Sequence, residues 1–348
     1  MLTLIDSHYR EATALYQRRG RLLNAPASPM TALRQLDGRL VANLDAVAIH
    51  QTGHPDAAQR LPDLFVEAWV GLQRDQARCL AVLDEIYPEL CVEQKSVVGQ
   101  AVCLSCSGSD GASQVPALQA AMMSPQAVMA LSEEDAGKTD PALAMWLMHH
   151  DAAGDDLTRF QPYYQDDSRP RSQRYALQAG LVRADQDAIH AARRFQDDAV
   201  FALLLALNGQ PPETLLGLGF SGSAGAARQL LNAMGEVARC EEAAQAWFWL
   251  KGEPAPRKPR LQAVGEGDGV SRDSLPDATE AARCWEAAQW QADARYFFGQ
   301  RASASSLEAL GQQWVGQVSA LVAAQQSWLA GHRVLPKRGW QLHPLAQG

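Results

Sequence analysis

The segment from residue 171 to residue 251 repeats one pattern, in which a short apolar or amphipathic helix is followed by a turn that contains glycine or proline. Residues 195–207, FQDDAVFALLLAL, become apolar on nearly every side, which at this length predicts a buried helix and not a membrane span. The Asn-Gly pair at 208–209 ends that helix, and the Pro-Pro pair at 211–212 begins the next turn. Because each helix has a wide apolar surface, neighbouring helices must pack against one another.

The next two helices follow the same pattern. Ser223 is placed to cap a helix whose apolar residues recur at three- and four-residue steps, namely Ala227, Leu230, Leu231, Met234 and Ala238. Residues 241–251 begin acidic and end basic, as the helix dipole favours, and Gly252 follows as a stop. Stacked helix pairs are typical of HEAT-like repeats. We therefore expect an all-α protein, a HEAT-like α-solenoid with an N-terminal helical region and a C-terminal helical cap.

Changes in composition predict the domain boundaries. A Gly/Ser-rich segment at 105–113 separates an N-terminal helical region, residues 1–108, from the helical array, residues 109–251. Residues 252–276 hold four glycines and four prolines, and we interpret them as a flexible linker. Residues 277–348 then form the C-terminal helical region.

The first fifty residues predict two helices. One covers about 7–23, and the second begins after the Ser-Pro pair at 28–29. The second helix has an apolar stripe formed by Leu33, Leu36, Leu40, Leu44 and Val47. Its other face carries Arg34, Asp37, Arg39 and Asn43.

Composition excludes several classes of function. With 348 residues, 47% hydrophobic and 20% charged, the chain has the composition of a folded protein and not of a disordered one. A formal net charge of −8 disfavours nucleic acid as a partner. The first twenty residues carry charges where a signal peptide needs an apolar core, and the longest apolar run, 199–207, is too short to span a membrane. We expect a cytoplasmic protein that binds neither membrane nor nucleic acid.

Three glycines resemble part of a dinucleotide-binding motif. Gly217, Gly219 and Gly222 match G-x-G-x-x-G and precede a helix, but the motif also needs a strand before it, and none is predicted. We interpret the glycines as a turn that connects two helices. Nucleotide binding at Gly217–Gly222 is kept as an alternative.

A second group of residues has the chemistry of a metal or acid/base site: His149, His150, Asp151, Asp155 and Asp156. Adjacent residues on a helix point about 100° apart, so both histidines cannot face one ion without distortion. We interpret the group as a solvated helix end, with a hydrolytic enzyme as the alternative. We therefore expect a chain that is not an enzyme, with no catalytic residues, cofactor or metal.

The best candidates for partner binding lie in residues 152–171, a polar and irregular segment that predicts an exposed loop. Aromatic side chains stand there among carboxylates, and the residues that we expect to contact a partner are Phe160, Tyr163, Tyr164, Asp166 and Asp167. Aromatic anchors surrounded by negative charge suit a basic protein surface. For the paired tryptophans at 247 and 249 and at 285 and 290, core packing is the default interpretation and partner binding the alternative.

Three segments contain patterns that resemble those of a known family. The first has a His, then Glu-Ala, an aromatic-x-x-Arg step and a Leu-x-x-Leu-Asp-x-Arg…Leu-Asp stretch, here His8, Glu11, Ala12, Tyr16, Arg19, Leu33, Leu36, Asp37, Arg39, Leu44 and Asp45. The others are GFSGSAGAARQLLNAM at 219–234 and RCWEAAQWQADARYFFGQRAS at 283–303. They resemble an uncharacterised bacterial family of HEAT-like proteins whose genes often lie beside type VI secretion components. The Gly-Asp-Pro turn of that family is replaced here by Gly-Ser-Ala at 222–224.

This resemblance implies a function without chemistry. The chain would be a protein-binding scaffold associated with type VI secretion. It would act as an immunity protein that neutralises a toxin effector, or as an adaptor that loads an effector. Its partner would be another protein, a secreted effector, and no catalytic residues come with the family.

Overall fold

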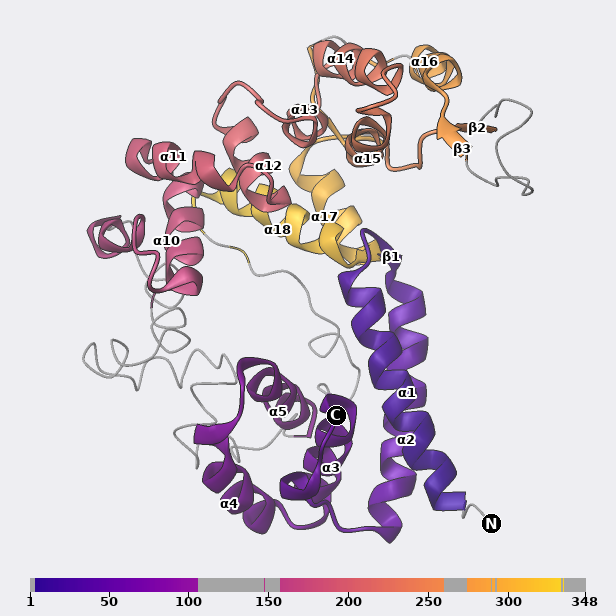
Figure 1. Ribbon diagram of the computed structural model, residues 1–348, viewed down its shortest axis with the longest axis vertical. Helices are drawn as coiled ribbons and strands as arrows, with labels where there is room; N and C mark the ends of the chain where they lie inside the picture. The colour runs from indigo at the N-terminus through magenta and orange to yellow at the C-terminus, as the bar shows by residue number, and fades with distance from the viewer. Residues whose placement is uncertain are drawn as a thin grey trace, which may run out of the picture. The chain divides into compact units, whose positions relative to one another are not determined.

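The chain is mostly helical (Figure 1). The strands in its described part are each two or three residues long. The computed structural model describes residues 4–105, 147, 157–259, 274–288, 290–291, 293–332 and 334. The expectation of an all-α protein is confirmed at this level. None of the described helices is long and apolar enough to cross a membrane. Residues 106–146 and 148–156, which cover the start of the expected array, lie outside the described part, so the HEAT-like arrangement stays a prediction.

The chain divides into two compact units, each built from separate stretches of sequence. The first unit contains Met1–Ala176, Leu310–Ala320 and Leu335–Gly348. The second contains Leu177–Ala309 and Leu321–Val334. Whether the four regions expected from composition are separate domains stays a prediction.

The first unit begins with an antiparallel hairpin of two long helices, α1 (Leu4–Asn24) and α2 (Met30–His50) (Figure 1). The expected stripe of α2 is buried, with Leu40 and Leu44 fully inaccessible to solvent. A short antiparallel pair, β1 (Ser28–Pro29) with β6 (Trp314–Val315), then joins the turn of this hairpin to the segment that precedes α18 (Gln317–Ala330). Gly316 has a φ of 97°, and a Cβ there would collide with the carbonyl oxygen of Ala25.

Shorter helices complete the described part of this unit. They are η1 (Pro55–Ala57), α3 (Leu61–Arg74), α4 (Gln76–Ile86), η2 (Tyr87–Glu89) and α5 (Val92–Ser105). Pro62 lies in the first turn of α3, where the missing N–H removes no helical hydrogen bond. The Phe65 side chain of α3 is fully buried, and its ring stacks on Tyr16 of α1 with 4.0 Å between centroids. This contact fixes α3 beneath the first hairpin.

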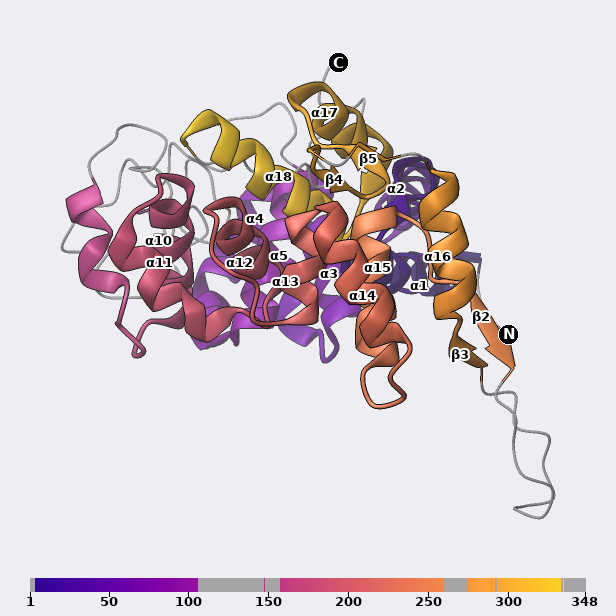
Figure 2. The ribbon, with the colours of Figure 1, turned by 90° about the horizontal axis from the view of Figure 1, so that it is seen from above.

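The second unit contains the helices of the repeated pattern. Its described elements begin with the part of α10 (Pro170–Val182) from Leu177 onwards. They continue with α11 (Gln186–Ala192), η6 (Arg193–Phe195), α12 (Ala199–Leu207), α13 (Leu215–Ser221), α14 (Ala224–Met234) and α15 (Cys240–Lys251). In Figures 1 and 2, α13, α14 and α15 lie side by side. The predicted cap at Ser223 is confirmed, since its hydroxyl accepts from the N–H of Ala226. The buried helix is also confirmed, because Leu203 and Leu204 in α12 are at most 1% exposed.

The segment after α15 begins as predicted and then forms a hairpin. Gly252 ends α15 in the left-handed conformation, with a φ of 77°. Strand β2 (Arg257–Pro259) pairs antiparallel with β3 (Ser274–Pro276), so both ends of the predicted flexible linker are hydrogen-bonded to each other. The residues between these strands lie outside the described part.

Helix α16 (Ala278–Ala287), the hairpin of β4 (Tyr296–Phe297) and β5 (Gln300–Arg301), and α17 (Ala304–Gln313) follow. Core packing is confirmed for Trp247 and Trp249, which are each 1% exposed.

Candidate functional site

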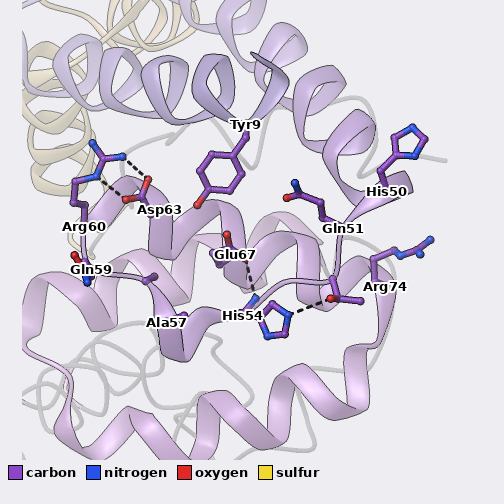
Figure 3. A pocket seen from close by; sticks show the side chains of 12 residues that line it. Tyr9, His50, Gln51, His54, Ala57, Gln59, Arg60, Asp63, Glu67 and Arg74 are labelled. Carbon is purple, nitrogen blue, oxygen red and sulfur yellow. Dashed lines mark hydrogen bonds and ion pairs between the residues drawn. The ribbon is translucent and has the colours of Figure 1, made fainter. Parts of the chain in front are cut away.

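The first unit contains a polar cavity of about 800 Å³ (Figure 3). It lies between α1, the connection from α2 to α3, and α3 itself. The side chains that matter for its chemistry are Tyr9, His50, His54, Arg60, Asp63, Glu67 and Arg74. A cavity of this size can hold a side chain of another protein or a small molecule.

Helix α3 supplies the charged groups of the cavity from a single face. Arg60 precedes its first turn, and Asp63, Glu67 and Arg74 follow at three, seven and fourteen residues. At about 100° per residue these positions fall within about 60° of one another. The apolar side of the helix, which includes Phe65 and Trp69, faces the core instead. The cavity is therefore lined by a carboxylate in the first turn of α3, Asp63, and another near its middle, Glu67, with Arg60 and Arg74 at the two ends of the helix.

Glu67 faces two elements that line the cavity, the connection from α2 to α3 and helix α1. Its Oε2 accepts a hydrogen bond of 2.8 Å from the backbone N–H of His54. Figure 3 shows the Tyr9 ring reaching from α1 towards Glu67 and Asp63. Burial of the phenol, followed by the charge and hydrogen bond of Glu67, raises the pKa of Tyr9 above its usual value. Tyr9 therefore stays protonated at neutral pH, with its hydroxyl facing the Glu67 carboxylate.

The connection between α2 and α3 rests directly on α3. A Cβ at Gly53 would collide with the carbonyl oxygen of Glu67 and with the backbone of Gly71. Only glycine allows this approach, and it brings the backbone N–H of His54 to the carboxylate of Glu67. The His54 ring turns towards Thr52, with 3.2 Å between Nε2 and the hydroxyl oxygen. The cavity wall is therefore held in place by contacts within the unit.

Arg60 and Asp63 form a two-point ion pair at one end of the cavity. Arg60 Nε lies 2.6 Å from Asp63 Oδ2, and Nη2 lies 2.8 Å from Oδ1. The arginine side chain is 69% exposed, whereas that of the aspartate is only 14% exposed. The carboxylate thus belongs to the cavity, and the guanidinium covers it from the solvent side.

The other end of the cavity carries His50 and Arg74, which are both exposed. Neither has a hydrogen-bond or ion-pair partner within the part of the chain that the structure describes. Among the described side chains, no three His, Cys, Asp or Glu residues come together in a way that could hold a metal ion.

Sequence reasoning missed this cavity. The signal in the sequence was the charged stripe of α3 opposite its apolar stripe, but a charged stripe of this kind is also typical of an ordinary solvated helix face. Nothing in the sequence indicated that Tyr9, more than fifty residues earlier, would face that stripe.

The predicted partner-binding aromatics are mostly buried. Phe160 and Tyr164 are 1% and 3% exposed, so the prediction that both are exposed anchors is wrong. Two short turns, η4 (Leu157–Arg159) and η5 (Gln161–Tyr163), fold the segment back on itself and direct both rings inwards. Tyr163 is half-buried and stays a predicted partner contact.

The two aspartates of the same segment have local partners. Asp166 Oδ1 accepts a hydrogen bond of 3.1 Å from the N–H of Ser168, and its other oxygen lies 3.9 Å from Arg169 Nε. Asp167 Oδ1 accepts from the side-chain amide of Gln173 at 3.0 Å. Both carboxylates stabilise the turn before α10. A contact of either with a partner stays a prediction.

The glycine motif is part of helix packing. Gly217 and Gly219 lie within α13, so the interpretation as a turn holds only for Gly222, which ends α13 with a φ of 68°. A Cβ on Gly219 would collide with the carbonyl oxygen of Ala246 in α15, so glycine allows the two helices to pack closely. In the described stretch from 157 to 216, no strand precedes the motif. The motif therefore lacks the strand that a dinucleotide site requires.

The other group, His149 to Asp156, lies outside the described residues. Its assignment as a solvated helix end or as a metal or acid/base site stays a prediction.

No family model, curated protein or solved structure matches this chain. The properties of the cavity are therefore inferred from its own side chains. It is a preformed polar site held by contacts among α1, the connection from α2 to α3, and α3. Its centre contains carboxylates, and cationic side chains lie at both ends.

Proposed function

We propose that this chain is a non-enzymatic scaffold, a HEAT-like α-solenoid that binds another protein in a type VI secretion system. It acts as an immunity protein that neutralises a toxin effector, or as an adaptor that loads an effector. The association with type VI secretion rests on the resemblance of three segments to the family named above. Binding of a protein rests on the surface around the cavity.

The residues that carry the resemblance support a scaffold because their contacts hold helices together. Arg19 of α1 pairs with Asp37 of α2 in the interior, with 2.9 Å between Nε and Oδ1. In the second unit, Arg295 donates to the carbonyl oxygens of Phe220 and Ser221 at the end of α13. These residues therefore stabilise the helical fold, and a binding scaffold depends on a stable fold.

The observation that carries the proposal is an exposed apolar side chain beside the rigid cavity. Ile49 is 63% exposed at the end of α2, immediately before the cavity residues His50 and Gln51. Leu4, at the start of the antiparallel α1, is 75% exposed at the same end of the hairpin. Apolar anchors next to well-held polar groups are typical of the residues that dominate protein–protein affinity.

Preorganisation strengthens this argument. Glu67 already accepts the hydrogen bond of the His54 N–H, and the buried Tyr9 phenol already faces Glu67, before any partner arrives. Binding therefore does not have to order these groups, a step that costs about 0.5–1.5 kcal/mol for each flexible side chain.

The proposal is tested by capture from the native host followed by measurement of affinity. The tagged chain is expected to retain a specific protein, and calorimetry on the purified pair gives its dissociation constant. Ile49→Glu should weaken binding at least tenfold, which is about 1.4 kcal/mol. Val237→Glu is the matched control, since Val237 is 76% exposed in the second unit. Equal affinities for the two variants would reject the proposed surface.

A growth assay separates the two roles. If the captured protein is a toxin, co-production of this chain should restore growth of cells that make the toxin. An adaptor would leave toxicity unchanged but would be required for export of its cargo.

A further inference from the structure

The carboxylates at the centre of the cavity offer more hydrogen-bond acceptor positions than the neighbouring donors use. An ionised carboxylate offers about four acceptor positions. Glu67 uses one position for the N–H of His54 and has another facing the phenol of Tyr9, and Asp63 uses two for Arg60. About two positions remain on each carboxylate, together with the oxygen of the phenol. A cationic group with several N–H donors satisfies both the charge and the free acceptor positions of the two carboxylates.

The cavity already shows which donor group fits. The guanidinium of Arg60 meets Asp63 through two parallel hydrogen bonds, the geometry that matches a planar fork to a carboxylate. This arginine is mostly exposed, and exposed ion pairs contribute little to stability. Its side chain can therefore leave Asp63 at little cost when a second guanidinium arrives.

We infer that the cavity binds the guanidinium group of an arginine side chain presented by the partner protein. The arginine reaches between Asp63 and Glu67 beneath the ring of Tyr9, and it replaces or joins Arg60 at the Asp63 carboxylate. This inference rests on the proposed protein-binding function and names the residue type that the partner contributes.

Arginine suits this site better than lysine. A guanidinium has five N–H donors in one plane and can bridge two carboxylates, whereas an ammonium acts as a single point of charge. The face of the Tyr9 ring can also stack on a planar cation. The overall charge of −8 favours approach of a basic partner surface.

A rival ligand is an anion held at the other end of the cavity. His50 and Arg74 are exposed there and could accept a carboxylate. A cationic ligand and an anionic ligand predict opposite effects when charges on this face of α3 are neutralised. Neutralising Glu67 weakens a cation and favours an anion, and neutralising Arg74 does the reverse.

The test uses the full chain and three blocked peptides, acetyl-Gly-Arg-Gly-amide and its Lys and Glu counterparts, titrated by ligand-observed NMR. The arginine peptide should bind at least threefold more tightly than the lysine peptide, and the glutamate peptide should not bind. Glu67→Gln should weaken the arginine peptide at least tenfold. Asp56→Asn is the matched control, because it removes the same charge from an exposed position next to the cavity and should leave binding unchanged. Arg60→Ala should tighten binding at least twofold.

Several results would overturn the inference. These are absence of arginine-peptide binding to both the parent and Arg60→Ala, equal binding to parent and Glu67→Gln, or binding of the glutamate peptide that is lost in Arg74→Gln. If Glu67→Gln does not fold, which its melting temperature will show, Asp63→Asn takes its place with the same expectation.

The failure of this inference can be told from failure of the proposed function. A partner whose affinity depends on Ile49 but not on Glu67 contradicts only the arginine. A chain that binds the arginine peptide but captures no protein contradicts only the protein-binding function.

Discussion

Arg19 of α1 and Asp37 of α2 form an ion pair inside the first unit, where their side chains are 2% and 3% exposed. Arg19 Nε lies 2.9 Å from Asp37 Oδ1. A buried charge without its partner is strongly unfavourable, whereas removal of both charges can be neutral. The pair therefore requires that α1 and α2 associate in one register.

Asp37→Leu should lower the free energy of unfolding by about 3–5 kcal/mol, because it leaves the arginine charge buried. The double variant Arg19→Met/Asp37→Leu should recover most of that loss. Urea unfolding of the parent, both single variants and the double variant measures the coupling. The account of the hairpin fails if the effects of the two single substitutions simply add.

This ion pair also shows how much of the structure can be predicted from the sequence. Helical periodicity predicted α2 and its buried leucines, but it placed Asp37 on the polar face with Arg39. Periodicity assigns a residue to a side of its helix and does not identify what covers that side. Arg39 pairs with Glu11 at the surface, while Asp37 is enclosed by α1.

The same limit explains the candidate site. Caps such as Ser223 depend on neighbours in the sequence and were predicted correctly. The burial of Phe160 and Tyr164 depends on how two short turns direct the rings, which residue types do not reveal. The cavity depends on Gly53 lying against α3 and on Tyr9 approaching from α1, and both are contacts between distant parts of the chain.

Leu204→Asp should abolish soluble folding of the chain. Leu204 is 1% exposed in α12, and an unpaired carboxylate in such a place costs several kcal/mol, comparable with the stability of a whole domain. Thermal unfolding and yield in the soluble fraction measure the effect. Val237→Asp, at a position that is 76% exposed, is the control and should melt close to the parent. A melting temperature for Leu204→Asp within about two degrees of the parent would contradict a buried α12.

Trypsin should cleave the chain slowly after Arg257 as long as the Arg257 side chain keeps its contacts within the protein. A flexible linker would be cut readily after Arg257, but Arg257 lies in β2, and its guanidinium donates to Glu241 and to the carbonyl oxygen of Ser274. Glu241→Ala removes the ion pair of Arg257 and leaves its hydrogen bonds to Ser274, so it should increase the rate of cleavage there, as peptide mass spectrometry would show. Glu236→Ala, which removes a separate pair with Arg239, should not. Rapid cleavage of the parent after Arg257 would instead favour the interpretation of residues 252–276 as a flexible linker.

Tyr16→Phe should change how stability depends on alkaline pH. Burial raises the pKa of Tyr16 from 10.0 to about 12. The folded state therefore holds this proton more tightly than the unfolded state, and the contribution is complete below pH 10 and disappears as the pH rises through 12.

At pH 8 the variant should be less stable by about 1 kcal/mol, since the hydrogen bond to Gln100 is lost while the ring still stacks on Phe65. By pH 11 the difference should shrink or reverse. Urea unfolding at the two pH values measures it. A constant difference would show that the phenol is not shielded from water.

The central claim is that a partner protein binds the cavity face of the first unit, and hydrogen–deuterium exchange of the chain with and without its partner tests it most directly. Residues 51–60 connect α2 to α3 and lie mostly outside helices, so their backbone amides that lack an internal hydrogen bond, unlike that of His54, exchange readily unless a partner covers them. The account predicts that binding slows exchange in this segment more than in residues 235–239, the exposed turn before α15. Unchanged exchange in residues 51–60, with protection elsewhere in the chain, would contradict it.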